Sequence, residues 1–330
     1  MTYRTALKVV SAIEQSEGVG ARVRRSIGIL NNRNFNPFLM LDHFKVSPKA
    51  GFPQHGHRGQ ETITLVLKGA IAHEDFTGSK GILYPGDLQF MTAGKGVVHS
   101  EMPVNLDGDQ TTMVEGMQLW VDLPESLRDT NPRYRDLRAY EIPEVVQQDG
   151  KVKVKVISGE SYGVESAHDL AYTPVQYYYA TLKPKGVYTQ KVPQNYNFFA
   201  YVLKGEKAVV NKDTVVPQYH NAFFNQDGDT IEISNEGSDE VELVLIGGEI
   251  LNQKTVQHGP FVADCQENIY KAFSDFQYGR NGFEKMKTWN SLISGGVTVD
   301  MIDELGGGIE KRKEDERKYL ESKKKEAETV

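Results

Sequence analysis

Two short pairs of possible metal ligands stand out in the first third of the chain. One residue separates His55 from His57, and one residue separates His99 from Glu101. On an extended strand, residues i and i+2 point to the same side, so each pair would direct two ligating side chains into one space. Two such strands lying side by side would form a site with four ligands.

The ligand types indicate which metals such a site would hold. Three neutral imidazoles and one carboxylate suit a divalent transition metal, whereas calcium and magnesium prefer mostly oxygen ligands. Coordination positions would stay open for a substrate or for dioxygen. Judged from the residues alone, iron, manganese, nickel, copper and zinc are all compatible with this ligand set.

Glu61 competes with Glu101 for the fourth position. It follows His57 by four residues, so on an uninterrupted strand it would point to the same side as the first histidine pair. Gly59 weakens this count, because glycine often marks a bulge or a kink in a strand. The spacing therefore leaves both carboxylates open as ligands.

The other histidines are isolated from these pairs. We expect each of them to be a surface residue or a hydrogen-bonded core residue, with no role as a ligand. They are His43, His73, His168, His220 and His258.

The segments that must position the ligands have the character of short β-strands. Runs rich in apolar and β-branched residues recur, for example at 62–67, 152–157 and 241–246. Turn sequences such as 85–87 and 227–229 separate such runs, and no long helical periodicity competes before the carboxyl end. The pattern predicts an all-β protein, and double-sheet jelly rolls fit it best.

An internal repeat predicts two such barrels. The sequence Leu-Lys-Gly ends an apolar run at 67–69 and again at 203–205, and a Gly-Asp turn follows each copy. The second copy has no histidine pair at the corresponding strands, so we expect it to bind no metal. We predict a metal-binding domain at 1–140 and a metal-free domain at 141–295.

A charged tail, 296–330, completes the predicted organisation. Its segment 309–328 carries eight Lys or Arg and seven Asp or Glu residues with almost no apolar stripe. Such a segment has no apolar face to bury. We expect a solvated charged helix or a disordered tail that does not dock on the barrels.

The composition excludes several classes of protein. A formal net charge of −7 argues against direct binding of nucleic acid, which needs a basic excess. No run approaches the length of apolar sequence that spans a membrane, and the first residues do not have the pattern of a secretory signal. The single cysteine, Cys265, agrees with a reducing compartment. We therefore expect a protein of the cytoplasm, the nucleus or both.

Longer motifs around the ligand pairs are similar to a known family. These are NPFLMLDHF at 36–44, HGHRGQETITLVLKGAIAHEDFTGSKG at 55–81 and PGDLQFMTAGKGVVHSEMP at 85–103. Together they resemble the signature region of the pirin family, within the cupin superfamily. The similarity extends from about Val23 to Trp289 and leaves the tail outside it.

The resemblance implies a fold and a ligand set. It implies a bicupin, in which two double-stranded β-helix barrels follow one another along the chain. It also implies that His55, His57, His99 and Glu101 bind one metal, usually iron, so Fe²⁺ is the expected cofactor. Glu61 would then lie just behind the ligands and fix the tautomer of an imidazole.

One function that follows from the resemblance is enzymatic. The chain resembles pirins that act as quercetin 2,3-dioxygenases, which open the heterocyclic ring of a flavonol with O₂ and release carbon monoxide. The substrate would be a flavonol or another small phenolic, and Glu101 or Glu61 would act as general base. Candidate pocket walls, which ordinary barrel core would explain equally well, are Phe52, Phe90, Met91 and Met102.

The alternative function is regulatory. The chain also resembles pirins described as nuclear iron proteins that bind transcription regulators, with the oxidation state of the metal changing the presented surface. Arg22, Arg24 and Arg25 would then belong to a basic surface that faces the partner, although a charged edge strand explains them equally well. Both functions need the same four ligands, and a site built within one domain leads us to expect a monomer.

Overall fold

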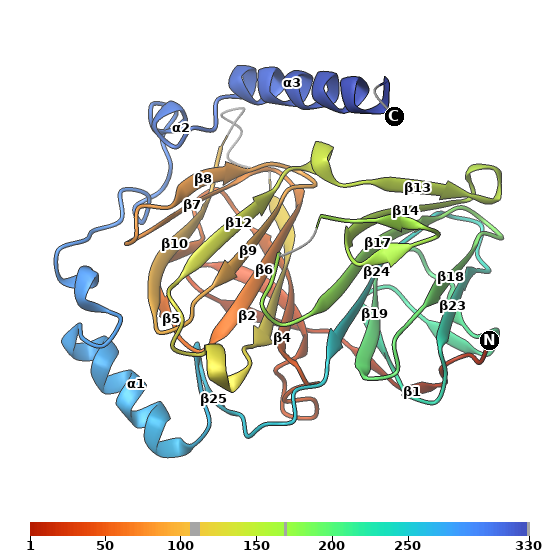
Figure 1. The fold of residues 1–330 in the computed structure, drawn as a ribbon, viewed down its shortest axis with the longest axis horizontal. Helices are drawn as coiled ribbons and strands as arrows, with labels where there is room; N and C mark the ends of the chain where they lie inside the picture. Colours follow the sequence, from red (N-terminus) through yellow and green to blue (C-terminus); the bar gives the residue numbers. More distant parts are fainter. Residues whose placement is uncertain (106–112, 168–169, 329–330) are drawn as a thin grey trace.

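The computed structural model describes residues 1–105, 113–167 and 170–328, and it places two β-barrels side by side (Figure 1). Each barrel consists of a seven-stranded sheet and a four-stranded sheet, and the neighbouring strands in these sheets are antiparallel. The predicted all-β architecture of two barrels is confirmed. His168 lies outside the described residues.

The first barrel contains the predicted metal ligands. Its larger sheet has the strand order β12-β9-β6-β11-β4-β3-β2, and its smaller sheet has the order β5-β10-β7-β8. In chain order these strands are β2 (Ile13–Glu17), β3 (Ala21–Ile27), β4 (Phe38–Val46), β5 (Phe52–His57), β6 (Gln60–Lys68), β7 (Ile71–Asp75), β8 (Lys80–Leu83), β9 (Leu88–Thr92), β10 (Val97–Pro103), β11 (Val114–Asp122) and β12 (Arg133–Leu137).

The second barrel repeats this plan. Its larger sheet has the order β1-β22-β19-β24-β17-β14-β13, and its smaller sheet has the order β18-β23-β20-β21. The strands are β1 (Ala6–Ser11), β13 (Glu144–Gln147), β14 (Val152–Ser158), β17 (Val175–Leu182), β18 (Val187–Lys191), β19 (Tyr196–Lys204), β20 (Ala208–Val210), β21 (Thr214–Val216), β22 (His220–Phe224), β23 (Thr230–Asn235) and β24 (Val241–Glu249). Two short hairpins are β15 (Glu160–Ser161) with β16 (Val164–Glu165), and β25 (Val256–His258) with β26 (Phe261–Ala263).

The α-helices of the described residues follow the second barrel in the sequence. They are α1 (Gln266–Tyr278), α2 (Met301–Glu304) and α3 (Ile309–Glu328), and the 3-10 turns are η1 (Glu125–Leu127), η2 (Ala139–Glu141), η3 (Gln148–Gly150) and η4 (Glu284–Lys287). No helix in the described ranges is long and apolar enough to cross a membrane.

The two ends of the chain cross between the barrels. The first strand, β1, pairs with β22 of the second barrel. Conversely, α1 and β26 follow the second barrel but pack on the first, where Ile269 and Phe261 share an apolar cluster with Met91 and Val98. The domain limits 1–140, 141–295 and 296–330 stay a prediction. Within these limits, β1 belongs to the first predicted domain but pairs with the second barrel, and α1 and β26 belong to the second predicted domain but pack on the first barrel.

Strand alternation decides which barrel has a polar interior. On β6, Ile63 and Leu65 pack in an apolar cluster that the two seven-stranded sheets share, with Phe199 and Val244 from the second barrel. The residue between them, Thr64, is therefore directed into the first barrel, where its hydroxyl contacts Glu101. The pairing of β6 with β11 fixes which side chains face inward, so polar groups such as Thr64 lie at the centre of the first barrel.

The tail does not remain free of the barrels, contrary to our expectation. Leu305 is buried together with Ile82 and Tyr84 at the β8 edge of the first barrel. At Gly307 a Cβ atom would lie only 2.5 Å from the Ile82 side chain, so a residue without a side chain is needed for this approach. The glycine run after α2 is thus a point of close packing.

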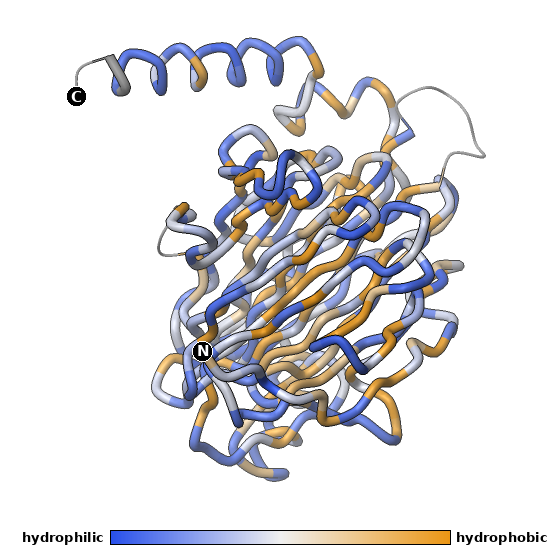
Figure 2. The backbone as a smooth tube through the Cα atoms, turned by 90° about the vertical axis from the view of Figure 1, so that its right-hand side faces the viewer, coloured by the Kyte–Doolittle hydropathy of each residue, from blue (hydrophilic) through white to orange (hydrophobic). Residues whose placement is uncertain are grey.

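An ion pair then anchors the start of α3. Both terminal nitrogens of Arg312 lie 2.6 Å from the carboxylate oxygens of Asp87, which is fully buried. Further along the helix, the ring of Tyr319 lies 5.4 Å from that of Tyr140. Figure 2 shows α3 as a mostly hydrophilic helix extending from the barrels. The prediction of an undocked tail is wrong. Although α3 has no apolar face, the packing of Leu305, the Arg312–Asp87 ion pair and the contact of Tyr319 with Tyr140 hold the tail on the first barrel.

Replacing Arg312 by alanine should lower the free energy of unfolding by about 1–3 kcal/mol, because the buried Asp87 carboxylate would lose a bidentate partner. Asp87 would still keep Arg138 and two backbone N–H donors. Urea denaturation measures the change. Arg317→Ala is the matched control, because this side chain is 66% exposed. Equal unfolding midpoints for the two variants would contradict the anchoring role of Arg312.

Candidate metal centre

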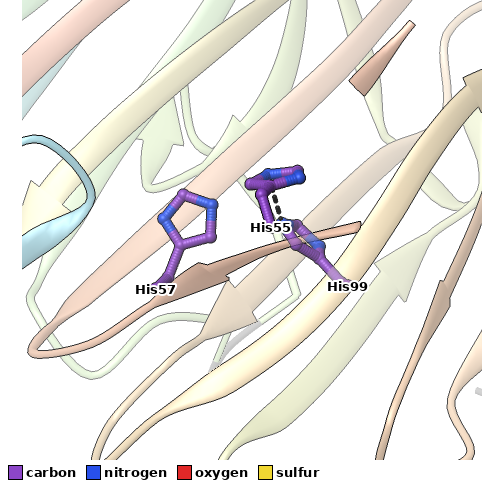
Figure 3. A group of neighbouring side chains, drawn as sticks. All are labelled: His55, His57 and His99. Atoms are coloured by element: carbon purple, nitrogen blue, oxygen red, sulfur yellow. Dashed lines mark hydrogen bonds between the residues drawn. The ribbon is translucent and has the colours of Figure 1, made fainter. Parts of the chain in front are cut away.

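Antiparallel pairing brings three histidines together. His55 and His57 lie on β5, and His99 lies directly opposite His55 on the neighbouring strand β10. The Nε2 atoms of His55 and His99 are 2.9 Å apart, and a possible ligand atom from each of the three rings lies within 4.8 Å of the others. Figure 3 shows the three rings gathered in this way. The same-side geometry predicted for alternate residues thus holds for the pair on β5.

Glu101 lies beside this group. Its Oε2 is 4.0 Å from Nε2 of His99, and only 6% of the residue is exposed. The Thr64 hydroxyl lies 3.3 Å from Oε1 but donates its proton at 2.6 Å to the side-chain oxygen of Gln118, whose amide nitrogen approaches Oε2 of Glu101 at 3.5 Å. The carboxylate is therefore held next to the imidazoles, and its roles as metal ligand and as base stay predictions.

The hydrogen bonds around the rings suit metal binding. Nδ1 of His55 lies 2.8 Å from the carbonyl oxygen of Pro53, which can only accept, so Nδ1 carries the proton and Nε2 keeps a lone pair, which faces Nε2 of His99. Nδ1 of His57 lies 2.8 Å from the side-chain amide of Gln60. The amide nitrogen of Gln60 is the atom nearest the ring, and the amide oxygen is buried without a partner. If the amide is turned by 180°, this oxygen accepts the Nδ1 proton and leaves Nε2 of His57 as a ligand atom. Nε2 of His57 is buried without a protein partner, as expected for an atom that meets a metal.

Burial keeps the rings of His57 and His99 neutral. The pKa values of His57 and His99 lie well below that of free imidazole, because burial disfavours the charged ring and neighbouring His55 repels it. Burial also raises the pKa of Glu101, and the electrostatic interaction with His55 offsets part of this effect. Neutral imidazoles have the lone pairs that a divalent cation needs.

Glu61 is not part of this group. Its carboxylate accepts hydrogen bonds from the Thr92 hydroxyl at 2.6 Å and from the backbone N–H groups of Tyr172 and Thr173. Tyr172 and Thr173 lie just before the first long central strand of the second barrel, β17. The prediction that Glu61 fixes an imidazole is wrong, because this carboxylate joins the two barrels.

A turn explains the error. Gly59 has a φ of +77°, and a Cβ atom there would lie 2.2 Å from a backbone oxygen, so the chain turns sharply between β5 and β6. The parity counted from His57 does not continue through this turn, because β6 belongs to the other sheet. Gln60 and Glu61 point to opposite faces of β6, and Gln60 takes the place that we predicted for Glu61.

A large cavity opens onto the imidazoles. It has a volume of about 850 Å³ and is lined by His55, His57 and Glu101 together with mostly apolar walls. The indole ring of Trp120 stands perpendicular to the ring of His57 at 5.1 Å between centroids. Among the predicted walls, Phe52 lines the cavity. The other three belong to apolar core clusters; these are Phe90, Met91 and Met102.

The arginines of β3 do not form a free basic surface. Arg22 and Arg24 both pair with Glu14, at 2.8 and 2.7 Å. Arg25 pairs with Asp42 and Glu17, each at 2.6 Å. The acidic residues therefore neutralise most of the charge that the sequence concentrates here.

Comparison with known proteins identifies the family. A family model described as Pirin matches residues 20–121, which include all four predicted ligands, and a model described as the Pirin C-terminal cupin domain matches residues 177–282. The chain belongs to the pirin family. Among its relatives, a pirin-like protein of Solanum lycopersicum is 43% identical over 288 residues, covering 87% of this chain and 96% of the relative. Human pirin is 42% identical over 293 residues, covering 88% of this chain and 98% of its own.

Solved structures support the pirin fold. A quercetin 2,3-dioxygenase from Acinetobacter baumannii superposes with a TM-score of 0.78 at 26% identity, covering 84% of this chain and 98% of that chain. The bacterial pirin YhhW from Escherichia coli, in complex with nickel(II), superposes with a TM-score of 0.57 at 20% identity, covering 74% and 99%. The second similarity is one of fold alone.

Replacing His57 by alanine should weaken metal binding by at least about 100-fold, because it removes a buried nitrogen aimed at the other two rings. The metal content of purified protein, measured by mass spectrometry, reports the loss. His220→Ala is the control, since its Nδ1 bonds the backbone of Gln218. Equal metal content in both variants would remove the site assignment.

Replacing Gln60 by leucine should lower metal affinity on the order of tenfold, because His57 would lose the partner that orients its ring. Glu61→Gln, one residue away on the opposite face of β6, should leave the affinity unchanged. Competition with a chromophoric chelator measures both variants. If Glu61→Gln weakened binding more than Gln60→Leu, the assignment of the two side chains would have to be exchanged.

Proposed function

We propose that this pirin family member is a metal-dependent dioxygenase of the quercetin 2,3-dioxygenase type. Fe²⁺ would be held by His55, His57, His99 and Glu101. One observation carries the proposal, namely that three clustered imidazoles, of which His55 and His57 line a large, mostly apolar cavity, stand beside a buried carboxylate that lines the same cavity. The fold shared with the Acinetobacter baumannii quercetin 2,3-dioxygenase supports it.

The side chains present suit this chemistry. When bound, the metal would supply Lewis acidity and exchange of electrons with dioxygen. Glu101 would take the proton of the flavonol 3-hydroxyl, because its carboxylate lines the cavity beside the imidazoles. Gln118, whose side-chain oxygen accepts from the Thr64 hydroxyl, would orient the carboxylate through its amide nitrogen during the transfer.

The overall reaction balances without a further reductant. Both atoms of O₂ would enter the ring-opened product, and one ring carbon would leave with its oxygen as carbon monoxide. The cavity would contribute a binding surface, because Met40, Phe44 and Trp120 offer apolar surface to aromatic rings.

The direct test is aerobic consumption of quercetin by the iron-loaded protein, with carbon monoxide detected as product. We expect turnover by the wild type and by His220→Ala, and none by His57→Ala. A wild-type protein that binds iron firmly and consumes no flavonol would refute the proposal. The arginine cluster on β3, already paired with acids, does not favour a binding role in its place.

The role of Glu101 is tested separately by Glu101→Gln. The amide keeps an oxygen that can face a metal but cannot accept the substrate proton. We expect kcat per bound iron to fall by about 100-fold or more, so the iron content of each preparation is measured beside its turnover. Full activity in this variant would show that another group acts as the base.

A further inference from the structure

The outer side of the sheet that bears the histidines is covered by the end of the chain. Gln54 precedes His55 on β5, and Ser100 stands between His99 and Glu101 on β10. Because side chains alternate along a strand, Ser100 points away from the interior that its two neighbours share. Residues 291–294 contact the sheet on this outer side.

The pairing of β5 with β10 is irregular at this point. His99 is opposite His55, but Glu101 is opposite Phe52, so β5 has one residue more than β10 over this stretch. Such a bulge leaves backbone groups outside the regular ladder. The N–H of Gln54 is donated to the side-chain hydroxyl of Ser294 at 3.0 Å, so a residue far along the chain supplies the acceptor.

The same hydroxyl also contacts the second strand. Oγ of Ser294 lies 2.8 Å from Oγ of Ser100, which is fully buried. Ser294 is itself fixed, because its own N–H donates to Oγ of Ser291 and the neighbouring Ile293 is fully buried. One hydroxyl thus joins β5 and β10 at residues that are next to three of the predicted ligands.

We propose that Ser294 is a positioning residue of the metal centre. By tying Gln54 to Ser100, it sets the separation of His55 from His99 across the bulge. Metal to nitrogen distances vary by only about 0.2 Å among working sites, so a small shift between the two strands changes affinity. The inference rests on the metal site of the proposed function and is independent of the reaction catalysed there.

Ser294 lies far from the metal-bearing sheet in the sequence and reaches it only in the folded chain. The family models end at residue 282, before this segment begins. The other end of β5 is braced from the same part of the chain, since Arg58 pairs with Asp275 of α1 at 3.0 Å. Gly56 lies against the ring of Phe276, where a Cβ atom would come within 2.5 Å. Both ends of β5 are therefore held by residues that follow the second barrel.

Cobalt(II) binding tests the role of Ser294, because cobalt absorption in the visible range reports ligand geometry. We expect Ser294→Ala to bind cobalt on the order of tenfold more weakly than the wild type and with a shifted spectrum. Ser294→Thr, which keeps the hydroxyl, should restore both properties. The control is Ser274→Ala on α1, whose hydroxyl accepts from Arg280 away from the sheet.

The outcomes separate this inference from the proposed function. Unchanged affinity and spectrum in Ser294→Ala, or a lower melting temperature of the metal-free variant without a spectral change, would overturn the positioning role. No cobalt binding by the wild type would instead remove the metal site. If Ser294→Ala does not fold, Ser100→Ala removes the other end of the same contact. Wild-type affinity in that variant would equally overturn the inference.

Discussion

The antiparallel pairing of β5 with β10 is the constraint on which the candidate site depends. It sets His55 opposite His99, and alternation along each strand then adds His57 and Glu101 to the same interior. Neutral rings with low pKa values persist there because the barrel excludes water. Nε2 of His57 is buried there without a protein partner, which is costly unless a cation meets it, and this is the physical reason for treating the group as a metal centre.

The barrel that holds this site is stabilised by apolar packing of its seven-stranded sheet against that of the second barrel. Ile63 and Leu65 of β6 pack toward the second barrel, while Thr64 between them turns to the carboxylate in the interior. In the second barrel, Phe199 of β19 packs toward the first barrel, and its neighbour Phe198 fills an apolar interior. The second barrel thus supplies apolar contact that the polar interior of the first barrel does not provide.

The chain ends connect the two barrels and brace the site. The first strand completes a sheet of the second barrel, and the segment from β25 to α3 returns to cover the first. This arrangement places Asp275, Ser294 and Arg312 on the outer surface of the metal-bearing barrel. Each makes a polar contact with a buried or half-buried group, so these contacts are specific as well as stabilising.

Local patterns in the sequence predicted the strands, the two barrels, the paired ligand motifs and the family, because alternation and turn chemistry act over a few residues. Tertiary structure decided the rest. The choice between Gln60 and Glu61 depends on a turn that moves the chain to another sheet, so the count of residues alone fails. The contacts of Arg312 and Ser294 join residues about 200 positions apart, and only the folded chain determines such neighbours.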